Sequence, residues 1–120
     1  GTVLSADPFG PVNSTKGVDL TTGRPIINPA KQTKLGETVR NICPTASGAK
    51  DWNPSSFSPR TGLIYIPHEN MCMDWMSMEV SYISGTPYVG ANVHMKPGPG
   101  GNRGELTAWD PVMRRPVGAV

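Results

Sequence analysis

The sequence predicts an all-β protein built from short strands and tight turns. Three observations predict this class: 14 glycines and 13 prolines are spread over 120 residues, apolar residues occur in short runs, and a turn-like sequence recurs. The one stretch nearly free of glycine and proline, residues 31–41, has too few apolar residues to define the buried face of a helix. We therefore expect no long helix.

Six segments have the composition or the alternating pattern of β-strands. In chain order they are Val3–Ser5, Gly17–Asp19, Leu63–Ile66, Met78–Ile83, Tyr88–Met95 and Leu106–Trp109. Pro67 is expected to end the third segment, because proline cannot donate a hydrogen bond to a sheet. Residues 96–104, with the sequence KPGPGGNRG, are predicted to form a solvated loop between two strands.

A short turn sequence occurs twice, and a degenerate third copy follows. Residues 19–23 (DLTTG) have the same form as residues 58–62 (SPRTG), and the third copy begins at Ala108 with the sequence AWDP. The spacings are 58 − 19 = 39 and 110 − 58 = 52 residues. Repeats of this length beside strands are typical of the four-stranded blades of a β-propeller, and a hairpin-rich β-sandwich is the alternative.

Charge and hydropathy argue against nucleic-acid binding and against a membrane-spanning segment. Eleven basic residues against nine acidic ones give a net charge of +2 without a dense basic run, so we expect no nucleic-acid binding. No segment has the length and apolar character of a membrane span, and the N-terminus lacks the pattern of a signal peptide. The chain begins and ends without caps or stop signals, as expected for a piece excised from a longer protein.

Cys43 and Cys72 lie 72 − 43 = 29 positions apart. This spacing fits neither a CxxC redox pair nor a zinc knuckle, which leaves one disulfide or two reduced thiols. We favour the disulfide, which would stabilise the fold by about 3 to 4 kcal/mol through loop-closure entropy and would indicate an oxidising compartment. The alternative is a pair of buried thiols in a cytosolic protein.

The polar segment from Lys50 to Asn53 is a candidate binding loop. It places a cation, an anion, an indole and an amide side by side, with neither helical nor strand periodicity. Such residues either complete a turn or bind a flat polar ligand. In a plain turn, Asp51 would accept hydrogen bonds from nearby backbone N–H groups and Trp52 would bury its ring.

Two sets of residues are candidate metal ligands. Thioether, thiol and imidazole groups suit a cuprous ion, but methionine more often fills irregular cores, and an oxidised Cys72 would be lost as a ligand. Three oxygen ligands lack the pattern of a calcium loop and are expected to lie in a solvated turn. The soft set is His68, Met71, Cys72, Met73, Met76, Met78, His94 and Met95, and the oxygen set is Glu69, Asn70 and Asp74.

Several ordered segments resemble the large subunit of the pyrroloquinoline quinone-dependent alcohol dehydrogenases of the methanol and ethanol dehydrogenase type. They are VLSADPFGPVN at residues 3–13, GVDLTTGRPI at 17–26, ICPTASGAKDWNPSSFSPRTGLIYIP at 42–67, NMCMDW at 70–75, YVGANVHMKPGP at 88–99 and LTAWDP at 106–111. The resemblance covers most of the chain. It implies an internal segment of that subunit, comprising about two blades of an eight-bladed propeller with tryptophan-docking repeats, divided near residues 45–60.

The resemblance also implies a function for the whole enzyme. Such an enzyme is periplasmic, binds pyrroloquinoline quinone with a calcium or lanthanide ion, oxidises primary alcohols such as methanol or ethanol, and passes electrons to a cytochrome c. The catalytic base and the metal ligands match no position in this chain, so we assign no catalytic or metal-binding residue and expect the isolated chain to be inactive. Two blades would leave open strand edges through which copies could associate.

Within this chain, the resemblance implies that Asp51 and Trp52 line the polar edge of the quinone. The family has an asparagine where Asp51 stands, and an ionised aspartate only accepts hydrogen bonds and would repel the carboxylates of the cofactor. The backbone N–H of Trp52 is independent of this change. The resemblance further implies the Cys43–Cys72 disulfide, and the third docking repeat departs from the family pattern at Gly118, where a tryptophan is expected.

Overall fold

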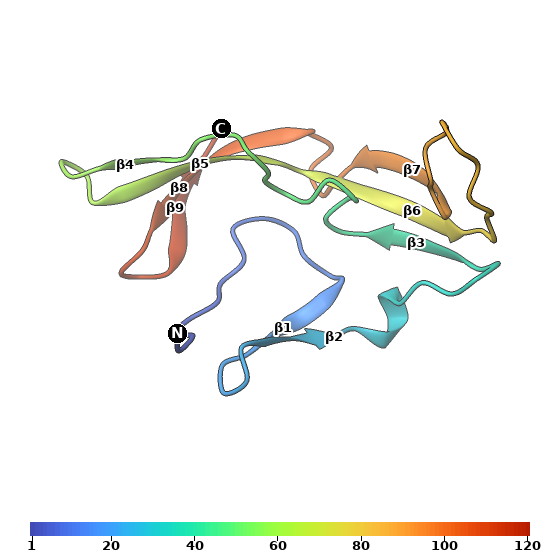
Figure 1. The fold of residues 1–120 in the computed structure, drawn as a ribbon. Helices are drawn as coiled ribbons and strands as arrows, with labels where there is room; N and C mark the ends of the chain where they lie inside the picture. Colours follow the sequence, from blue (N-terminus) through green and yellow to red (C-terminus); the bar gives the residue numbers. More distant parts are fainter.

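The computed structural model describes residues 1–120 and confirms the all-β prediction (Figure 1). Its single helical segment is a three-residue 3-10 turn, η1 (Pro29–Lys31), and no helix is long and apolar enough to cross a membrane. The strands are β1 (Thr15–Asp19), β2 (Arg24–Ile27), β3 (Thr38–Ile42), β4 (Ser56–Ser58), β5 (Leu63–Glu69), β6 (Met71–Ser77), β7 (Ala91–Pro97), β8 (Gly104–Asp110) and β9 (Arg115–Ala119).

The strands form three antiparallel sheets. β1 pairs with β2, a second sheet has the order β3-β6-β7, and the third has the order β4-β5-β8-β9. β5 runs on into β6, and their partners β7 and β8 also follow one another, so one long hairpin passes through two sheets (Figure 1). The two larger sheets therefore meet where this hairpin is interrupted, at residue 70. We call residues 68–70, the end of β5 and this interruption, the β5–β6 joint.

Asn70, the last residue of the β5–β6 joint, is only 1% exposed. Its amide nitrogen donates to the carbonyls of Pro99 and Asn102 at 2.8 and 3.1 Å, and to Oδ1 of Asn102 at 3.0 Å. Its backbone N–H donates to the carbonyl of Arg103, and its own carbonyl accepts from the N–H of Gly98. The predicted solvated loop is therefore wrapped around a buried amide, and β7 extends to Pro97 before the loop begins.

His68, the first residue of the β5–β6 joint, is also buried, with no exposed side-chain surface. Its Nε2 lies 2.9 Å from Oγ1 of Thr107 in β8 and 3.6 Å from the carboxylate of Glu105. The ring of Phe9 packs edge-on against the imidazole at a centroid distance of 5.3 Å. His68 therefore joins β5 to β8 and holds the N-terminal segment against them.

The predicted disulfide is confirmed: Cys43 and Cys72 are bonded, with their Cα atoms 4.4 Å apart. The bond links the end of β3 to β6. Asn13 binds beside it, since its Oδ1 accepts from the N–H of Cys43 and its Nδ2 donates to the carbonyl of Asn41, both at 2.8 Å. These contacts matter because the core is small. Its buried apolar residues are Ile42, Cys43, Cys72, Met73 and Ala91.

The carboxylate of Asp74 in β6 connects all three strands of the β3-β6-β7 sheet. Its Oδ1 accepts from Nζ of Lys96 in β7 at 2.7 Å and from the backbone N–H of Asn41 in β3 at 2.8 Å. Its Oδ2 lies 3.4 Å from the guanidinium of Arg40. The hydrogen bond from Lys96, followed by that from Asn41, lowers the pKa of Asp74 from its ordinary value of 3.8 to about 2.

The recurring turn is confirmed as a structural repeat. Hairpins β1–β2, β4–β5 and β8–β9 are each closed by a residue pair five positions apart. These pairs are Asp19–Arg24, Ser58–Leu63 and Asp110–Arg115. The carboxylates of Asp19 and Asp110 accept hydrogen bonds from the second and third residues after them. These bonds lower the pKa of Asp19.

The three turns differ at the residue that must take a positive φ. Gly23 and Gly62 occupy this position with φ of 69° and 70°, whereas the third turn places Arg114 there with φ of 53°. A left-handed conformation costs a residue with a Cβ about 1–2 kcal/mol. The third copy therefore departs from the repeat at Arg114 as well as at Gly118, and Gly118 pairs with Ala108 beside a register shift.

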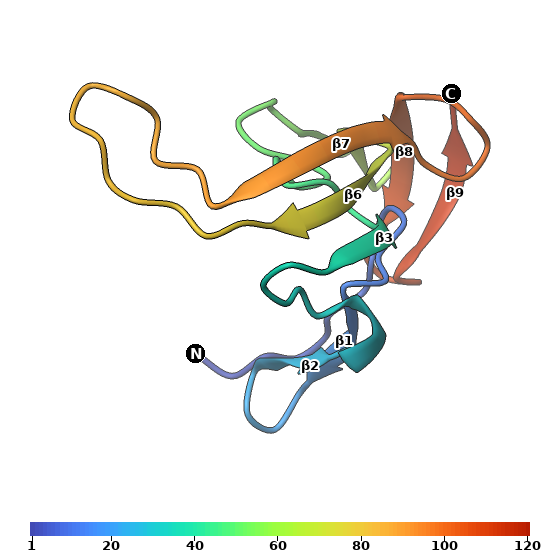
Figure 2. The same cartoon turned by 90° about the vertical axis from the view of Figure 1, so that its right-hand side faces the viewer.

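Two predicted strands, Val3–Ser5 and Met78–Ile83, are wrong: neither segment is regular. Residues 78–90 form a long loop that projects beyond β6 and β7 (Figure 2). Tyr82 and Ile83 in this loop are 73% and 64% exposed, so the alternation of residue types does not reflect one buried face. The preceding segment, rich in methionine, forms strand β6 instead.

Pro67 does not end its strand, because β5 continues to Glu69. Pro67 lies opposite Leu106 of β8. The N–H of Leu106 points away from β5 and donates to the carbonyl of Val120. The nitrogen of Pro67 therefore points toward the β4 side, and β4 pairs only with residues 63–65. No ladder hydrogen bond is lost there, which is why proline is tolerated within this strand.

We predict that Gly98→Ala destabilises the protein while Gly104→Ala does not. A Cβ at position 98 would lie 2.9 Å from Cγ of Asn70, whereas a Cβ at position 104 would meet only the carbonyl of His68 at 3.5 Å. Overpacking a buried contact costs about 1–3 kcal/mol, and a tolerated substitution changes stability by about 0.5 kcal/mol or less. Urea denaturation measures both. Equal stabilities of the two variants would contradict the role of Asn70.

We also predict that Asp74→Asn destabilises the protein in a pH-dependent way. The folded-state pKa of Asp74, about 2, lies below its ordinary value of 3.8, so its carboxylate favours the folded state above that value. This contribution is lost as the pH falls toward about 2. The difference in unfolding free energy between wild type and Asp74→Asn should therefore be constant near neutral pH and shrink between about pH 4 and pH 2. A difference independent of pH would contradict this account.

Candidate functional site

Asp51 and Trp52 lie in the segment that leads from β3 to β4, and both side chains are exposed. The ring of Trp52 is not buried: 88% of the residue's surface is exposed. The carboxylate of Asp51 accepts no hydrogen bond, in contrast to the carboxylates of Asp19 and Asp110 in the hairpin turns. The plain-turn interpretation required a bonded Asp51 and a buried Trp52, so neither of its two conditions is met.

The loop that carries these residues is nevertheless anchored. The backbone N–H of Thr45 donates to the carbonyl of Met71 at 3.0 Å, and that of Gly48 donates to the carbonyl of Thr45 at 2.9 Å. Nζ of Lys50 donates to the carbonyl of Asn53, which closes the tip of the loop. We call residues 45–53 the cofactor loop, after the binding role that the sequence predicts for Asp51 and Trp52.

The tip of the cofactor loop has unused hydrogen-bond donors. No backbone N–H from residue 50 to residue 53 donates a hydrogen bond within the chain. Together with the exposed indole, these N–H groups fit a flat ligand that carries acceptor oxygens at its edge. The ionised carboxylate of Asp51 fits such an edge poorly where the ligand itself is anionic. The backbone and Trp52 therefore suit a quinone better than the side chain of Asp51 does.

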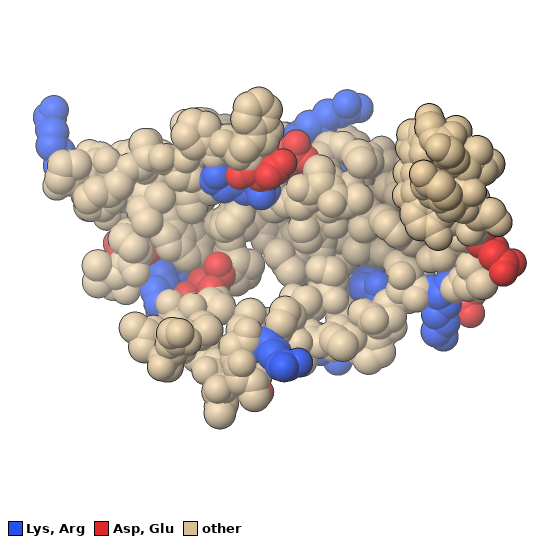
Figure 3. All heavy atoms as spheres, viewed as in Figure 1, with Lys and Arg blue, Asp and Glu red and all other residues tan.

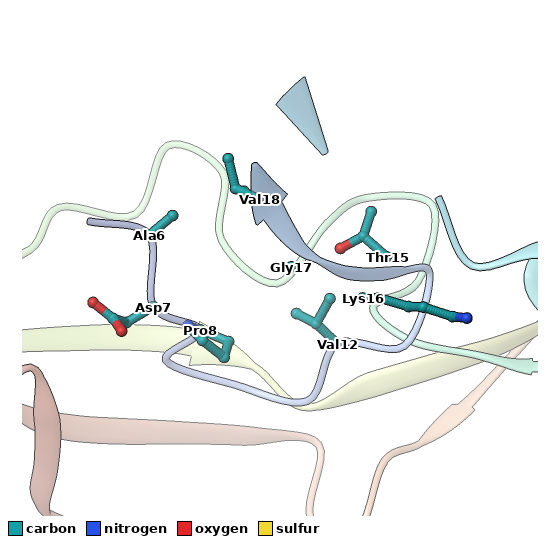
Figure 4. A pocket seen from close by; sticks show the side chains of 8 residues that line it. All are labelled: Ala6, Asp7, Pro8, Val12, Thr15, Lys16, Gly17 and Val18. Atoms are coloured by element: carbon teal, nitrogen blue, oxygen red, sulfur yellow. The ribbon is translucent and has the colours of Figure 1, made fainter. Parts of the chain in front are cut away.

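The cofactor loop lines none of the main hollows of the chain. One hollow, of about 530 Å³, lies between the N-terminal segment and β1, and the carboxylate of Asp7 and the ammonium of Lys16 lie at its opposite ends (Figure 4). A second, of about 290 Å³, lies where Phe9 approaches Ile64 and Trp109. Asp51 and Trp52 thus form an exposed surface and not the wall of an enclosed pocket.

The soft-metal candidates do not gather into one cluster, although Met73 lies opposite Met95, and Met76 and His94 line one hollow. Cys72 is oxidised, and the imidazole of His68 is engaged with Thr107. Successive residues of a strand point to opposite faces, so Met71 and Met73 lie on one face of β6, and Cys72 and Met76 lie on the other. No group of three or more histidine, cysteine, aspartate or glutamate side chains has metal-binding geometry.

The three candidate oxygen ligands have structural roles. The expectation of a solvated turn is wrong: Glu69 lies in β5, Asp74 lies in β6, and Asn70, between these two strands, is buried. Asn70 is buried in its loop and Asp74 is paired with Lys96, whereas Glu69 contacts the cofactor loop. Sequence reasoning missed this last contact. The only available signal was the order His-Glu-Asn immediately after an apolar strand.

Charge is not concentrated on the face of the molecule seen in Figure 3. Lysine and arginine side chains are interspersed there with aspartate and glutamate, and no large patch has a single sign. The candidate site therefore consists of free backbone N–H groups and one exposed aromatic ring.

Comparison with known proteins places the chain among alcohol dehydrogenases. No family model matches it. It is 46% identical over 121 residues to a lanthanide-dependent methanol dehydrogenase of Methylorubrum extorquens, covering 92% of this chain and 20% of that protein. A lanthanide-dependent methanol dehydrogenase of Methylacidiphilum fumariolicum is 46% identical over 98 residues, covering 82% and 16%. A quinoprotein ethanol dehydrogenase of Pseudomonas aeruginosa is 32% identical over 124 residues, covering 98% and 20%.

Solved structures agree. The chain superposes on a europium-containing methanol dehydrogenase with a TM-score of 0.88 at 40% identity, covering 97% of this chain and 21% of that one. A quinohemoprotein alcohol dehydrogenase from Comamonas testosteroni gives a TM-score of 0.77 at 29% identity, covering 98% and 18%. The prediction of about two propeller blades is confirmed by this agreement. The chain spans about one fifth of the length of these relatives. The chain belongs to the family of pyrroloquinoline quinone-dependent alcohol dehydrogenases of the methanol and ethanol dehydrogenase type.

Proposed function

We propose that this chain is part of a periplasmic enzyme that oxidises methanol or another primary alcohol with pyrroloquinoline quinone and a metal ion. The names of the relatives support this, since they are methanol, ethanol and lanthanide-dependent dehydrogenases. Identity is 46% to lanthanide-dependent methanol dehydrogenases and 33% to subunit 1 of a methanol dehydrogenase named for cytochrome c. The higher identity to lanthanide-dependent relatives favours a lanthanide as the metal of the whole enzyme.

The role that we propose for this chain is to hold the polar edge of the cofactor. The observation that carries it is the 88% exposure of Trp52 on an anchored loop whose neighbouring N–H groups have no partner in the chain. An exposed aromatic ring on an anchored loop is available to stack on a flat ligand. Trp52 would supply a ring face and its backbone N–H, and Asp51 would contribute through its own backbone N–H.

In the whole enzyme, pyrroloquinoline quinone would supply the hydride acceptor, and a metal ion would supply Lewis-acid polarisation. The residues of this chain would act on binding and orientation alone. The free N–H groups at the loop tip would donate hydrogen bonds to the acceptor oxygens of the quinone and hold them in place. They would take no part in proton transfer. We assign no catalytic base to this chain and expect the isolated chain to show no alcohol oxidation.

The partners of the whole enzyme are also proposals. A cytochrome c acceptor is supported by the names of related large subunits, which are cytochrome c-linked methanol dehydrogenases. The division of the chain into two blades near residues 45–60 stays a prediction, as does association of copies through open strand edges. No observation favours the alternative of a copper-binding protein, because Cys72 is oxidised and His68 is engaged.

We predict that Trp52→Ala weakens quinone binding in the full-length enzyme and that Asp51→Asn strengthens it. Loss of the ring removes a stacking surface, and loss of the carboxylate removes repulsion of an anionic cofactor; each change should alter the dissociation constant by about threefold to tenfold. The measurement is titration of the apoprotein with pyrroloquinoline quinone, followed by absorbance. Tyr82→Ala is the matched control, because Tyr82 is an exposed aromatic residue in another loop. Unchanged binding in both loop variants would remove these residues from the site.

A further inference from the structure

We propose that Ser47 and Glu69 are positioning residues that set the orientation of the cofactor loop and thereby the affinity for the quinone. Glu69 is the middle residue of the β5–β6 joint. Its carboxylate Oε2 accepts a hydrogen bond from Oγ of Ser47 at 3.1 Å, and its backbone N–H donates to the carbonyl of Ala49 at 2.6 Å. This inference rests on the proposed function of Asp51 and Trp52 and extends it to their support.

The contact between Ser47 and Glu69 is the single side-chain hydrogen bond between the cofactor loop and the strands. Every other tie to the strands is made by backbone groups, at Thr45 and Ala49. The remaining side-chain bond of the loop, from Lys50 to Asn53, is internal to it. Ser47 lies midway between the two backbone ties, so its hydroxyl determines how the intervening residues lie against the strand.

Glu69 is suited to this task because its own position is fixed on both sides. His68 before it has no exposed side-chain surface, and Asn70 after it is 1% exposed. A group held by two buried neighbours on a strand is a rigid support, whereas a loop residue would move with the loop. Asp51 follows Ala49 by two residues, so a change in the anchor is transmitted over a short length of chain.

The effect of losing the side-chain contact should be moderate. The backbone bond between Glu69 and Ala49 remains in any side-chain variant, and a hydrogen bond to an exposed carboxylate contributes less than a buried one. We therefore expect partial loosening of the loop and weaker binding, and not unfolding. Such a role is separable from that of the residues that touch the cofactor.

The test uses Ser47→Ala, Glu69→Ala and their combination in the full-length enzyme. Titration of the apoprotein with pyrroloquinoline quinone should show each single variant to bind about threefold more weakly. The double variant should be no weaker than the singles, because both remove the same bond. Glu69→Gln should restore binding, since its amide oxygen can accept from Ser47. Glu79→Ala, at an exposed glutamate in the loop of residues 78–90, is the matched control.

A second readout needs no cofactor. Tryptic cleavage of the apoprotein after Lys50 should be faster in both single variants and unchanged in Glu79→Ala, at an unaltered melting temperature. If the wild-type enzyme binds no quinone, both the proposed function and this inference are overturned. If the wild type binds and the single variants bind equally well, or if their effects add, the positioning role is overturned while the proposed function stands.

Discussion

The hydrogen bonds made by the buried Asn70 are the interactions on which the rest of the structure depends. The two side-chain N–H groups of Asn70 lie within hydrogen-bond distance of three acceptors in the loop between β7 and β8, while its backbone bonds both ends of that loop. Replacing Asn70 would remove these bonds from the part-buried carbonyls of Pro99 and Asn102. Because Asn70 interrupts the long hairpin at a defined point, the hairpin can contribute to two sheets instead of one.

The neighbours of Asn70 extend its effect in two directions. His68 reaches Thr107 and the N-terminal segment, and Glu69 reaches the cofactor loop. Three consecutive residues thus contact four segments: β8, the N-terminal segment, the cofactor loop and the loop between β7 and β8. In a strand, alternating side chains diverge to opposite faces, and this divergence lets a short joint organise parts of the chain far apart in sequence. The proposed site is therefore supported by the same residues that hold the sheets together.

Specific polar contacts and one covalent bond carry much of the stability because the apolar core is small. Nine of 120 residues are buried, and large apolar side chains such as Leu4 and Val112, each 85% exposed, face outward. The Cys43–Cys72 bond and the Asp74 cluster both connect β3 to β6. Relatives about five times longer offer neighbouring blades that would cover such side chains, and in a two-blade segment the hydrogen bonds and the disulfide gain weight.

Local chemistry in the sequence by itself determined the all-β class and the repeated turns, because glycine and proline act within a few residues. The sequence favoured the disulfide over two free thiols, and a series of ordered motifs indicated the family. It also indicated the cofactor loop as a candidate. Tertiary structure alone decided that Pro67 lies inside a strand, that Met78–Ile83 does not form one, and that Asn70 is buried. These outcomes depend on which neighbours a residue meets across the sheet. The alternation of apolar and polar residues along the chain does not indicate where a partner strand ends or which loop covers a polar side chain.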